Sequence, residues 1–213
     1  MKTILFQGDS ITDTCRKDEY ICHLGMGYPL LVASRLGLDH PNCYSFFNRG
    51  VSGYRIVDIY AQIKRDIINL KPDVMSLLIG VNDVWHELDS KNGVDTPKFK
   101  MIYKMLLDEI LTALPGIKII LMEPFVLKGQ YTKPFYETFR AQVKEKAIAV
   151  RQIAEEYQLP FISLQEELED LTKFAPAEYW LLDGVHPNIY FHQYIADRWI
   201  ETFTAMENTH CVK

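Results

Sequence analysis

Residues 3–10 are Thr-Ile-Leu-Phe-Gln-Gly-Asp-Ser, and this stretch decides how the start of the chain folds. A short run such as residues 3–7, with Ile-Leu-Phe at its centre, is typical of a strand buried in a sheet. Gly8 follows at once, and glycine allows the backbone to turn sharply where a strand ends. The sequence therefore predicts that Ser10 lies where the first strand gives way to a loop or a helix.

Four more short apolar runs follow, and longer segments with helical spacing separate them. The runs cover residues 44–48, 74–79, 117–122 and 161–164. Apolar residues recur every three or four positions in residues 56–70, 102–114, 135–157 and 195–203. This alternation predicts right-handed strand–helix–strand units and a parallel sheet. We therefore expect a single domain, residues 1–213, of the α/β class, with three layers: a five-stranded parallel sheet in flavodoxin-like order and helices on both faces.

Composition narrows the class of partner. The chain of 213 residues has 23 Lys and Arg against 28 Asp and Glu, a net charge of −5. Nucleic acids and anionic membranes bind basic faces, so this balance disfavours both as partners and suits a neutral small molecule. The first apolar run is shorter than a signal-peptide core, and no stretch approaches the roughly 20 apolar residues of a membrane span.

The cysteines favour a reducing compartment. Their spacing fits no zinc-ligand pattern, and two disulfides would require an oxidising compartment that nothing in the sequence supports. We therefore expect a cytoplasmic protein with reduced thiols. The four cysteines are Cys15, Cys22, Cys43 and Cys211.

Polar motifs stand where the strands are predicted to end, which is the edge at which doubly wound sheets bind ligands. Ser10 is either a nucleophile or the N-cap of a helix. Gly50 and Gly53 precede the helix that starts near Ile56, so each either presents a backbone N–H group to an oxyanion or simply allows a turn. Asn82 follows the third strand, and its amide either donates to developing negative charge or belongs to an Asn-Asp turn.

Another motif, Asp183-Gly-Val-His186-Pro187, stands near the C-terminus. If Asp183 accepts the proton of one ring nitrogen of His186, the other nitrogen can act as a general base toward a serine. The alternatives are an aspartate that caps the last helix beside a surface histidine, and a metal site with His192 as an additional ligand. No metal-binding motif supports the metal site. Together the motifs supply a nucleophile, a base, an orienting acid and oxyanion donors, and this combination favours catalysis.

In the order and spacing of these motifs, the chain resembles the GDSL, or SGNH, hydrolase family. Four blocks carry the resemblance over essentially the whole chain: Gly-Asp-Ser-Ile with Ser10, Asn-Arg-Gly-Val-Ser-Gly with Gly53, Gly-Val-Asn-Asp with Asn82, and Asp-Gly-Val-His-Pro with His186. The departure is Ile11, which replaces the family's leucine at nearly constant volume. Gly53 suits the family's donor position better than Gly50, because that glycine stands just ahead of the helix.

The resemblance implies an SGNH-hydrolase fold and a two-step acyl transfer that requires no cofactor and no metal. Ser10 would be the nucleophile, His186 the general base and Asp183 the residue that orients it. The backbone N–H groups of Ser10 and Gly53 and the side-chain amide of Asn82 would hold the oxyanion.

Further details look like the carbohydrate O-acetylesterases of this family, in particular bacterial acetyl-xylan or xylo-oligosaccharide esterases. They are residues 25–29 (Gly-Met-Gly-Tyr-Pro), 79–85 (Ile-Gly-Val-Asn-Asp-Val-Trp), 123–125 (Glu-Pro-Phe) and Trp180. The likeness implies a small-molecule ester as substrate, above all an acetylated sugar, and it is compatible with a homo-oligomer. The alternatives are a lysophospholipase or thioesterase with the same residues, and a non-catalytic carbohydrate-binding protein on the same fold.

Four residues are candidates for substrate binding: Asp9, Trp85, Phe125 and Trp180. Aromatic faces stack on sugar rings and wall off small acyl pockets, although core or interface positions explain the three aromatic residues equally well. Asp9 and Asp13 flank the nucleophile. We expect both to brace its loop through hydrogen bonds, with solvated loop acids as the alternative.

Overall fold

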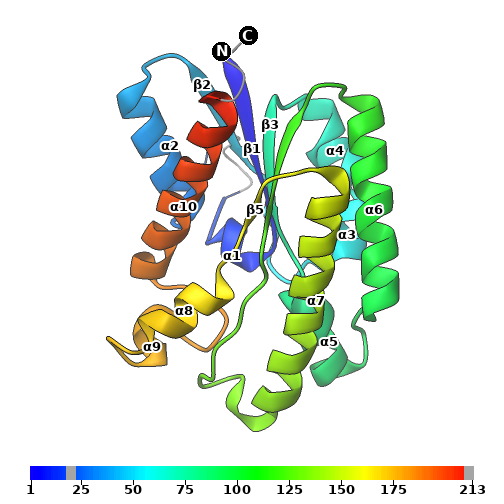
Figure 1. The fold of residues 1–213 in the computed structure, drawn as a ribbon, viewed down its shortest axis with the longest axis vertical. Helices are drawn as coiled ribbons and strands as arrows, with labels where there is room; N and C mark the ends of the chain where they lie inside the picture. Colours follow the sequence, from blue (N-terminus) through cyan, green and yellow to red (C-terminus); the bar gives the residue numbers. More distant parts are fainter. Residues whose placement is uncertain (18–22, 209–213) are drawn as a thin grey trace.

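A five-stranded sheet separates two layers of helices in the computed structural model, which describes residues 1–17 and 23–208 (Figure 1). Neighbouring strands are all parallel, in the order β2-β1-β3-β4-β5. The expected α/β class, the five strands and the flavodoxin-like order are therefore confirmed. The strands are β1 (Lys2–Gly8), β2 (Tyr44–Asn48), β3 (Val74–Leu78), β4 (Lys118–Met122) and β5 (Phe161–Ile162).

Alternate residues of the strands enter two separate cores, one on each face of the sheet. In β1, Ile4 and Phe6 enter the core on one face, and Leu5 enters the core on the other. Side chains alternate in this way because successive residues of a strand point to opposite faces. Both faces of the central strands are covered, which explains why their sequences are continuously apolar.

The helices α2 (Tyr28–Asp39) and α10 (Ile189–Asn208) cover the first face, on the left of Figure 1. The ring of Phe6 lies between them, with its centroid 5.7 Å from that of Tyr28 and 5.4 Å from that of Trp199. All three side chains are fully buried. The shorter helices α8 (Gln165–Leu171) and α9 (Ala177–Trp180) continue this layer beyond β5.

The second face is covered by α6 (Thr96–Ala113), α7 (Tyr136–Tyr157) and a broken helical segment. A 3-10 turn, η2 (Lys133–Phe135), precedes α7. The broken segment consists of α3 (Ile56–Ala61), α4 (Ile63–Asp66) and η1 (Ile68–Leu70), where the sequence predicts one helix. Residues 56–70 are rich in β-branched residues, which form helices less readily than leucine or alanine. Packing on the sheet therefore prevails over continuous helical hydrogen bonds in this segment.

Two further helices begin at the carboxyl ends of the strands. The single turn of α1 (Ser10–Asp13) follows β1, and α5 (Val81–Ser90) follows β3. Figure 1 shows α1 and α5 beyond the ends of these central strands, on the side away from the N-terminus. The predicted position of Ser10 at the end of the first strand is therefore confirmed.

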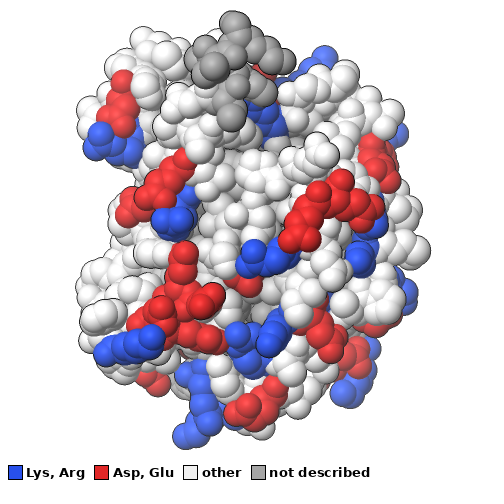
Figure 2. Space-filling model, in the orientation of Figure 1, with Lys and Arg blue, Asp and Glu red and all other residues white. Residues whose placement is uncertain are grey.

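Charged side chains of both signs are interspersed on the face that Figure 2 shows. Acidic side chains gather over α8, where the sequence Gln-Glu-Glu-Leu-Glu-Asp-Leu carries four carboxylates (Figure 2). Within residues 1–17 and 23–208, none of the helices has the length and apolar character that crossing a bilayer requires.

Candidate active site

Ser10 is the first residue of α1, immediately after the turn that ends β1. Asp9 caps this helix, because its Oδ1 accepts a hydrogen bond of 3.0 Å from the backbone N–H of Ile11. The N-cap is therefore Asp9, and the alternative of Ser10 as the cap is wrong. A Cβ atom at Gly8 would lie 2.4 Å from the carbonyl oxygen of Leu78, so only glycine allows β1 to end this close to β3.

A chain of hydrogen bonds links Ser10 to two residues near the C-terminus. Ser10 Oγ lies 2.8 Å from His186 Nε2, and His186 Nδ1 lies 2.6 Å from Asp183 Oδ2. The second carboxylate oxygen, Asp183 Oδ1, accepts bonds of 2.8 Å from the backbone N–H groups of Val185 and His186. With both oxygens engaged, the carboxylate holds the imidazole so that Nε2 faces the serine.

The turn from Asp183 to His186 is positioned by a short antiparallel ladder rather than by the last helix. Leu181 pairs with Pro187, and the backbone N–H of Leu182 donates to the carbonyl of His186. The cap of α10 is Asn188, whose Oδ1 accepts from the N–H groups of the first helical turn. The alternative in which Asp183 caps the last helix is therefore wrong.

Electrostatics in the pair favours an ionised Asp183 and a basic His186. Burial raises the pKa of Asp183, but the hydrogen bonds from His186 and Val185 outweigh it and keep the pKa below its ordinary value. The hydrogen bond to Asp183 raises the pKa of His186, against the opposing effect of burial, and the carboxylate of Asp9 adds to the rise. Burial also raises the pKa of Asp9 itself to about 7.

Three N–H groups are candidate donors to an oxyanion: the backbone groups of Ser10 and Gly53 and the side-chain amide of Asn82. Asn82, at the start of α5, is 5% exposed and uses one amide hydrogen on the carbonyl of Tyr54 at 3.1 Å, which leaves the other hydrogen available. The backbone N–H groups of Ser10 and Gly53 donate to no atom among the described residues. Gly53 has φ +81°, a conformation that glycine adopts without strain.

The rival glycine, Gly50, is engaged elsewhere. Its N–H donates to Asn48 Oδ1 at 2.8 Å, and a Cβ atom there would lie 2.5 Å from the backbone nitrogen of Asp13. Gly50 therefore serves close packing between two loops. The geometry favours Gly53 as the donor, in agreement with the expectation from its place just ahead of α3.

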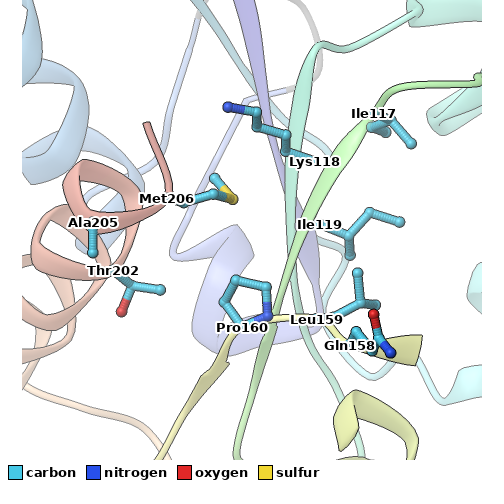
Figure 3. Close-up of a pocket in the computed structure, with 9 residues that line it drawn as sticks. All are labelled: Ile117, Lys118, Ile119, Gln158, Leu159, Pro160, Thr202, Ala205 and Met206. Atoms are coloured by element: carbon cyan, nitrogen blue, oxygen red, sulfur yellow. The ribbon is translucent and has the colours of Figure 1, made fainter. Parts of the chain in front are cut away.

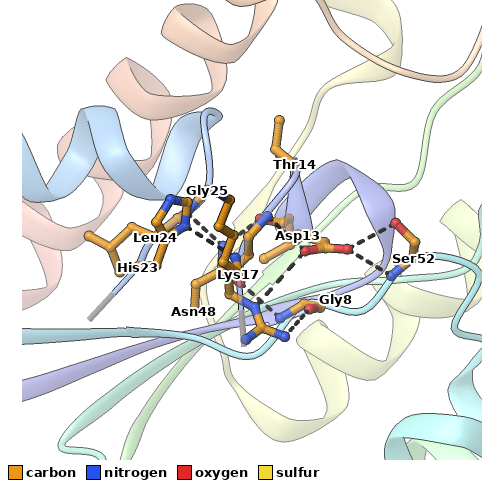
Figure 4. A network of polar contacts seen from close by, with 12 residues as sticks. Gly8, Asp13, Thr14, Lys17, His23, Leu24, Gly25, Asn48 and Ser52 are labelled. Atoms are coloured by element: carbon orange, nitrogen blue, oxygen red, sulfur yellow. Dashed lines mark hydrogen bonds and ion pairs between the residues drawn. The ribbon is translucent and has the colours of Figure 1, made fainter. Parts of the chain in front are cut away.

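The loop after β1 and the loop after β2 are joined by a polar network (Figure 4). Asp13 Oδ2 accepts bonds from the backbone N–H and the hydroxyl of Ser52, at 3.2 and 2.9 Å. Asn48 Nδ2 donates to the carbonyls of Thr12 and Leu24, at 2.6 and 2.8 Å. These bonds hold the segment next to Gly53 against α1, so the bracing expected of Asp13 is present.

The four candidate substrate-binding residues fall into two groups. The ring of Trp85 lies 6.1 Å from the ring of His186, and Trp180 is half-buried in the ladder that carries the Asp183 turn. Phe125 is fully buried against Phe191, and Asp9 is 1% exposed beneath the serine turn. The expectation that Phe125 and Asp9 contact substrate is therefore wrong, since both lie in the interior. Asp9 instead braces the loop through its bond to Ile11, as expected, and the alternative of a solvated loop acid does not hold for it.

The metal alternative finds no geometric support at His192. This residue is 3% exposed, its ring stacks on Tyr28, and its Nδ1 accepts the backbone N–H of Tyr28 at 3.3 Å. Burial lowers the pKa of His192 to about 4, so the ring is a neutral part of the core.

Figure 3 shows the residues that line a large apolar cavity at the amino ends of β4 and β5. It has a volume of about 630 Å³ and is lined by the first residues of β4, the segment before β5 and the last turns of α10. Because these are amino ends of strands, the cavity is separated from Ser10 by the length of the sheet. It offers no space for the acyl chain of an ester bound at Ser10.

Two residues of α5 near the site, Asp83 and His86, belong to no function that the sequence motifs indicate. The carboxylate of Asp83 accepts the backbone N–H of Ile56 at 3.2 and 3.3 Å, and this bond joins the start of α3 to the start of α5. His86 lies one helical turn beyond Asn82, beside Gly53. Once a helix over residues 81–90 is predicted, the four-residue spacing of Asn82 and His86 can be read from the sequence. The bond from Ile56 to Asp83 can be seen only in the structure.

Comparisons with known proteins agree with this geometry. The chain is 34% identical to an acetylxylan esterase of Geobacillus stearothermophilus. The alignment spans 204 residues and covers 91% of this chain and 90% of that protein. A crystal structure of that acetylxylan esterase superimposes with a TM-score of 0.83 at 30% identity, over 94% of this chain and 93% of the other. A protein named as a GDSL-like lipase from Parabacteroides merdae superimposes with a TM-score of 0.88 at 33% identity, over 94% of both chains.

The model of the GDSL-like lipase/acylhydrolase family matches residues 6–194, a range that contains every residue of the site described above. The resemblance predicted from the four sequence blocks is thus confirmed, and with it the activity class of an ester hydrolase. By its sequence and by its fold, the chain belongs to the GDSL-like lipase/acylhydrolase family.

Proposed function

We propose that this protein is a serine esterase that removes small acyl groups, acetyl above all, from carbohydrates such as xylo-oligosaccharides, through an acyl-enzyme on Ser10. The observation that carries the proposal is the hydrogen-bonded chain from Ser10 Oγ through His186 to Asp183. The acetylxylan esterase of Geobacillus stearothermophilus supports the substrate class, because its similarity extends over nine-tenths of this chain.

In the first step, Ser10 Oγ attacks the ester carbonyl and its proton passes to His186 Nε2. Asp183 stabilises the resulting imidazolium. The carbonyl oxygen becomes an oxyanion that faces the N–H groups of Ser10, Gly53 and Asn82. His186 then returns the proton to the departing alcohol oxygen, and the bond between that oxygen and the acyl carbon breaks.

In the second step, water replaces the alcohol. His186 takes a proton from the water as its oxygen attacks the acyl carbon, and the same N–H groups hold the second oxyanion. The bond to Ser10 Oγ breaks as His186 returns the proton to it, which regenerates the serine and releases the carboxylic acid.

Two features support a small acyl group. The ring centroid of Trp85 lies 6.1 Å from that of His186 and 5.9 Å from that of Phe139. These bulky side chains limit the room beside the imidazole of His186. The large apolar cavity lies at the other end of the sheet, out of reach of Ser10. We propose Trp85 and Trp180 as walls of the acyl or sugar site, with Trp180 placed by the ladder that carries the Asp183 turn.

The cysteines support action in a reducing compartment such as the cytoplasm. Cys15 and Cys43 are exposed free thiols, which an oxidising compartment would leave open to disulfide exchange. Cys22 and Cys211 lie outside the described residues.

The experiment measures acetate release from acetylated xylo-oligosaccharides, beside hydrolysis of 4-nitrophenyl acetate, 4-nitrophenyl octanoate and acetyl-CoA. We expect acetyl esters and sugar acetates to be the best substrates, and Ser10→Ala to abolish hydrolysis while leaving Tm nearly unchanged. Ser34→Ala, on the exposed side of α2, is the matched control. Faster hydrolysis of octanoyl esters or acyl-CoA would assign the protein to the lysophospholipase or thioesterase class. Sugar binding without hydrolysis would make it a carbohydrate-binding protein.

A further inference from the structure

The ring of His86 stands beside the candidate oxyanion donor Gly53. A Cβ atom built on Gly53 would lie 3.9 Å from His86 Nε2 and 4.0 Å from Cε1; among the described residues, apart from the two chain neighbours of Gly53, no other atom lies within 4 Å. Among the described residues, the imidazole is therefore the group that borders the side of Gly53 where a side chain would point. A ligand bound against this side of Gly53 would have the ring as its neighbour.

His86 shares one face of α5 with two residues of the candidate site. Positions three and four apart in a helix lie on the same side, so Asn82, Trp85 and His86 form one stripe. Trp85 extends from this stripe toward His186, and His86 extends toward Gly53. At 1.5 Å per residue, His86 lies about 6 Å along the helix axis from Asn82, roughly the breadth of a sugar ring.

The imidazole of His86 has no hydrogen-bond partner among residues 1–17 and 23–208. Asp58 on α3 interacts with His86 electrostatically, but its hydrogen bonds come from Arg55, through the backbone N–H and Nε, both at 2.9 Å, and through Nη2 at 3.1 Å. A half-buried ring with one donor and one acceptor thus faces the site without an internal partner. A hydroxyl group, which also donates and accepts, is the complementary chemistry.

We propose that His86 binds a hydroxyl group of the sugar ring that carries the ester, and so makes the enzyme specific for polyhydroxylated leaving groups. This inference rests on the proposed function. His86 acts as a positioning residue: it orients the leaving alcohol while the neighbouring N–H groups hold the ester oxygen. It takes no proton in the reaction, and esters without a neighbouring hydroxyl gain nothing from it.

The experiment compares two acetates whose rings match in shape. Cyclohexyl acetate has no hydroxyl group, and trans-2-acetoxycyclohexanol has one beside the ester. We define the preference as the ratio of kcat/KM for the second substrate to kcat/KM for the first. His86→Phe keeps the ring and removes both nitrogens, and His86→Gln retains a donor and an acceptor. His40→Phe, an exposed histidine just after α2 and before β2, at the opposite end of the sheet, is the matched control.

We expect His86→Phe to lower the preference five- to tenfold, the usual worth of one hydrogen bond to a neutral group, because kcat/KM falls more for trans-2-acetoxycyclohexanol than for cyclohexyl acetate. His86→Gln should retain more of the preference than His86→Phe, and His40→Phe all of it. An unchanged preference in His86→Phe, or an equal loss on both substrates, would overturn the inference.

The wild-type enzyme separates this inference from the proposed function. If it releases acetate from acetylated xylobiose no faster than from cyclohexyl acetate, the proposed function fails and the role of His86 fails with it. If it strongly prefers the acetylated sugar and His86→Phe leaves that preference intact, only the role of His86 is refuted.

Discussion

Replacement of Asp183 by asparagine should inactivate the enzyme through the wrong histidine tautomer. The two backbone N–H groups that donate to Asp183 Oδ1 will hold the amide oxygen of the asparagine in the same place. Its NH2 group must then face His186 Nδ1, where the carboxylate Oδ2 now stands at 2.6 Å. Nδ1 becomes an acceptor, so the ring proton moves to Nε2 and opposes the hydroxyl of Ser10.

The size of the effect follows from the same bonds. Turning the amide around would restore the tautomer but would set the NH2 group against two backbone donors. Each lost bond to a half-buried group costs about 1–3 kcal/mol, so the competent orientation is disfavoured by about 2–6 kcal/mol. Loss of the charge that stabilises the imidazolium adds to this cost. We therefore expect kcat to fall by about 10³–10⁴, at 1.36 kcal/mol for each factor of ten.

The assay is steady-state hydrolysis of 4-nitrophenyl acetate from pH 6 to pH 9, together with thermal unfolding. KM should change less than about threefold, because the carboxylate does not contact the substrate. Asp170→Asn, an exposed aspartate of α8 paired with Lys173, is the matched control and should retain full activity. A folded Asp183→Asn enzyme with more than a tenth of the wild-type kcat would refute the reasoning.

Three further changes test the surroundings of the serine. Asn82→Ala removes one oxyanion donor and should lower kcat by about 10²–10³ with little change in KM, measured with the same ester; an equal rise in KM would instead indicate a role in ground-state binding. Asp9→Asn keeps the helix cap but removes a carboxylate that raises the pKa of His186, so the acidic limb of the kcat/KM profile should move to lower pH; a shift to higher pH would contradict the assigned interaction. The pKa of Asp9 is itself raised to about 7, so its ionisation opposes folding, and the advantage of the asparagine variant in Tm should grow as pH rises from about 4 to about 7. Asp83→Ala leaves the buried N–H of Ile56 without its acceptor and should lower the free energy of unfolding by about 1–3 kcal/mol in urea denaturation. It should also affect kcat more than KM, and an unchanged unfolding curve would show that the bond contributes nothing.

The layered fold was predictable because its signals are local. The apolar run of residues 3–7 and the runs after it indicate buried strands by themselves, and the spacing of apolar residues indicates the helices between them. The observed strands agree with these runs, with β3 and β5 ending one and two residues earlier than the sequence predicts. The segment from Ile56 to Leu70 is the exception, because helical spacing marks its buried side correctly but not the breaks at Gln62 and Ile67.

Several roles in the site could not be assigned from the sequence. Gly50 and Gly53 are the same residue type in the same loop, so residue type does not distinguish them. Only the bond from the Gly50 N–H to Asn48 Oδ1 shows that this N–H already has an acceptor. Phe125 and Asp9 stand next to motif residues along the chain but are buried beneath the site. Adjacency in sequence does not indicate exposure, since the side of the backbone on which a residue lies depends on elements that pack against it from elsewhere.

By itself, the sequence determined that this chain forms a parallel α/β sheet. It also determined that a serine, an aspartate–histidine pair and N–H donors stand at the ends of strands and the starts of helices. These properties depend on residue type and short-range spacing. Only the tertiary structure decided that Ser10 and His186, 176 positions apart, lie 2.8 Å from each other, and that the ring of His86 stands beside Gly53. Contacts over such separations arise when helices pack on a twisted sheet. Their geometry is set by the sum of many weak contacts, which no single stretch of the chain contains.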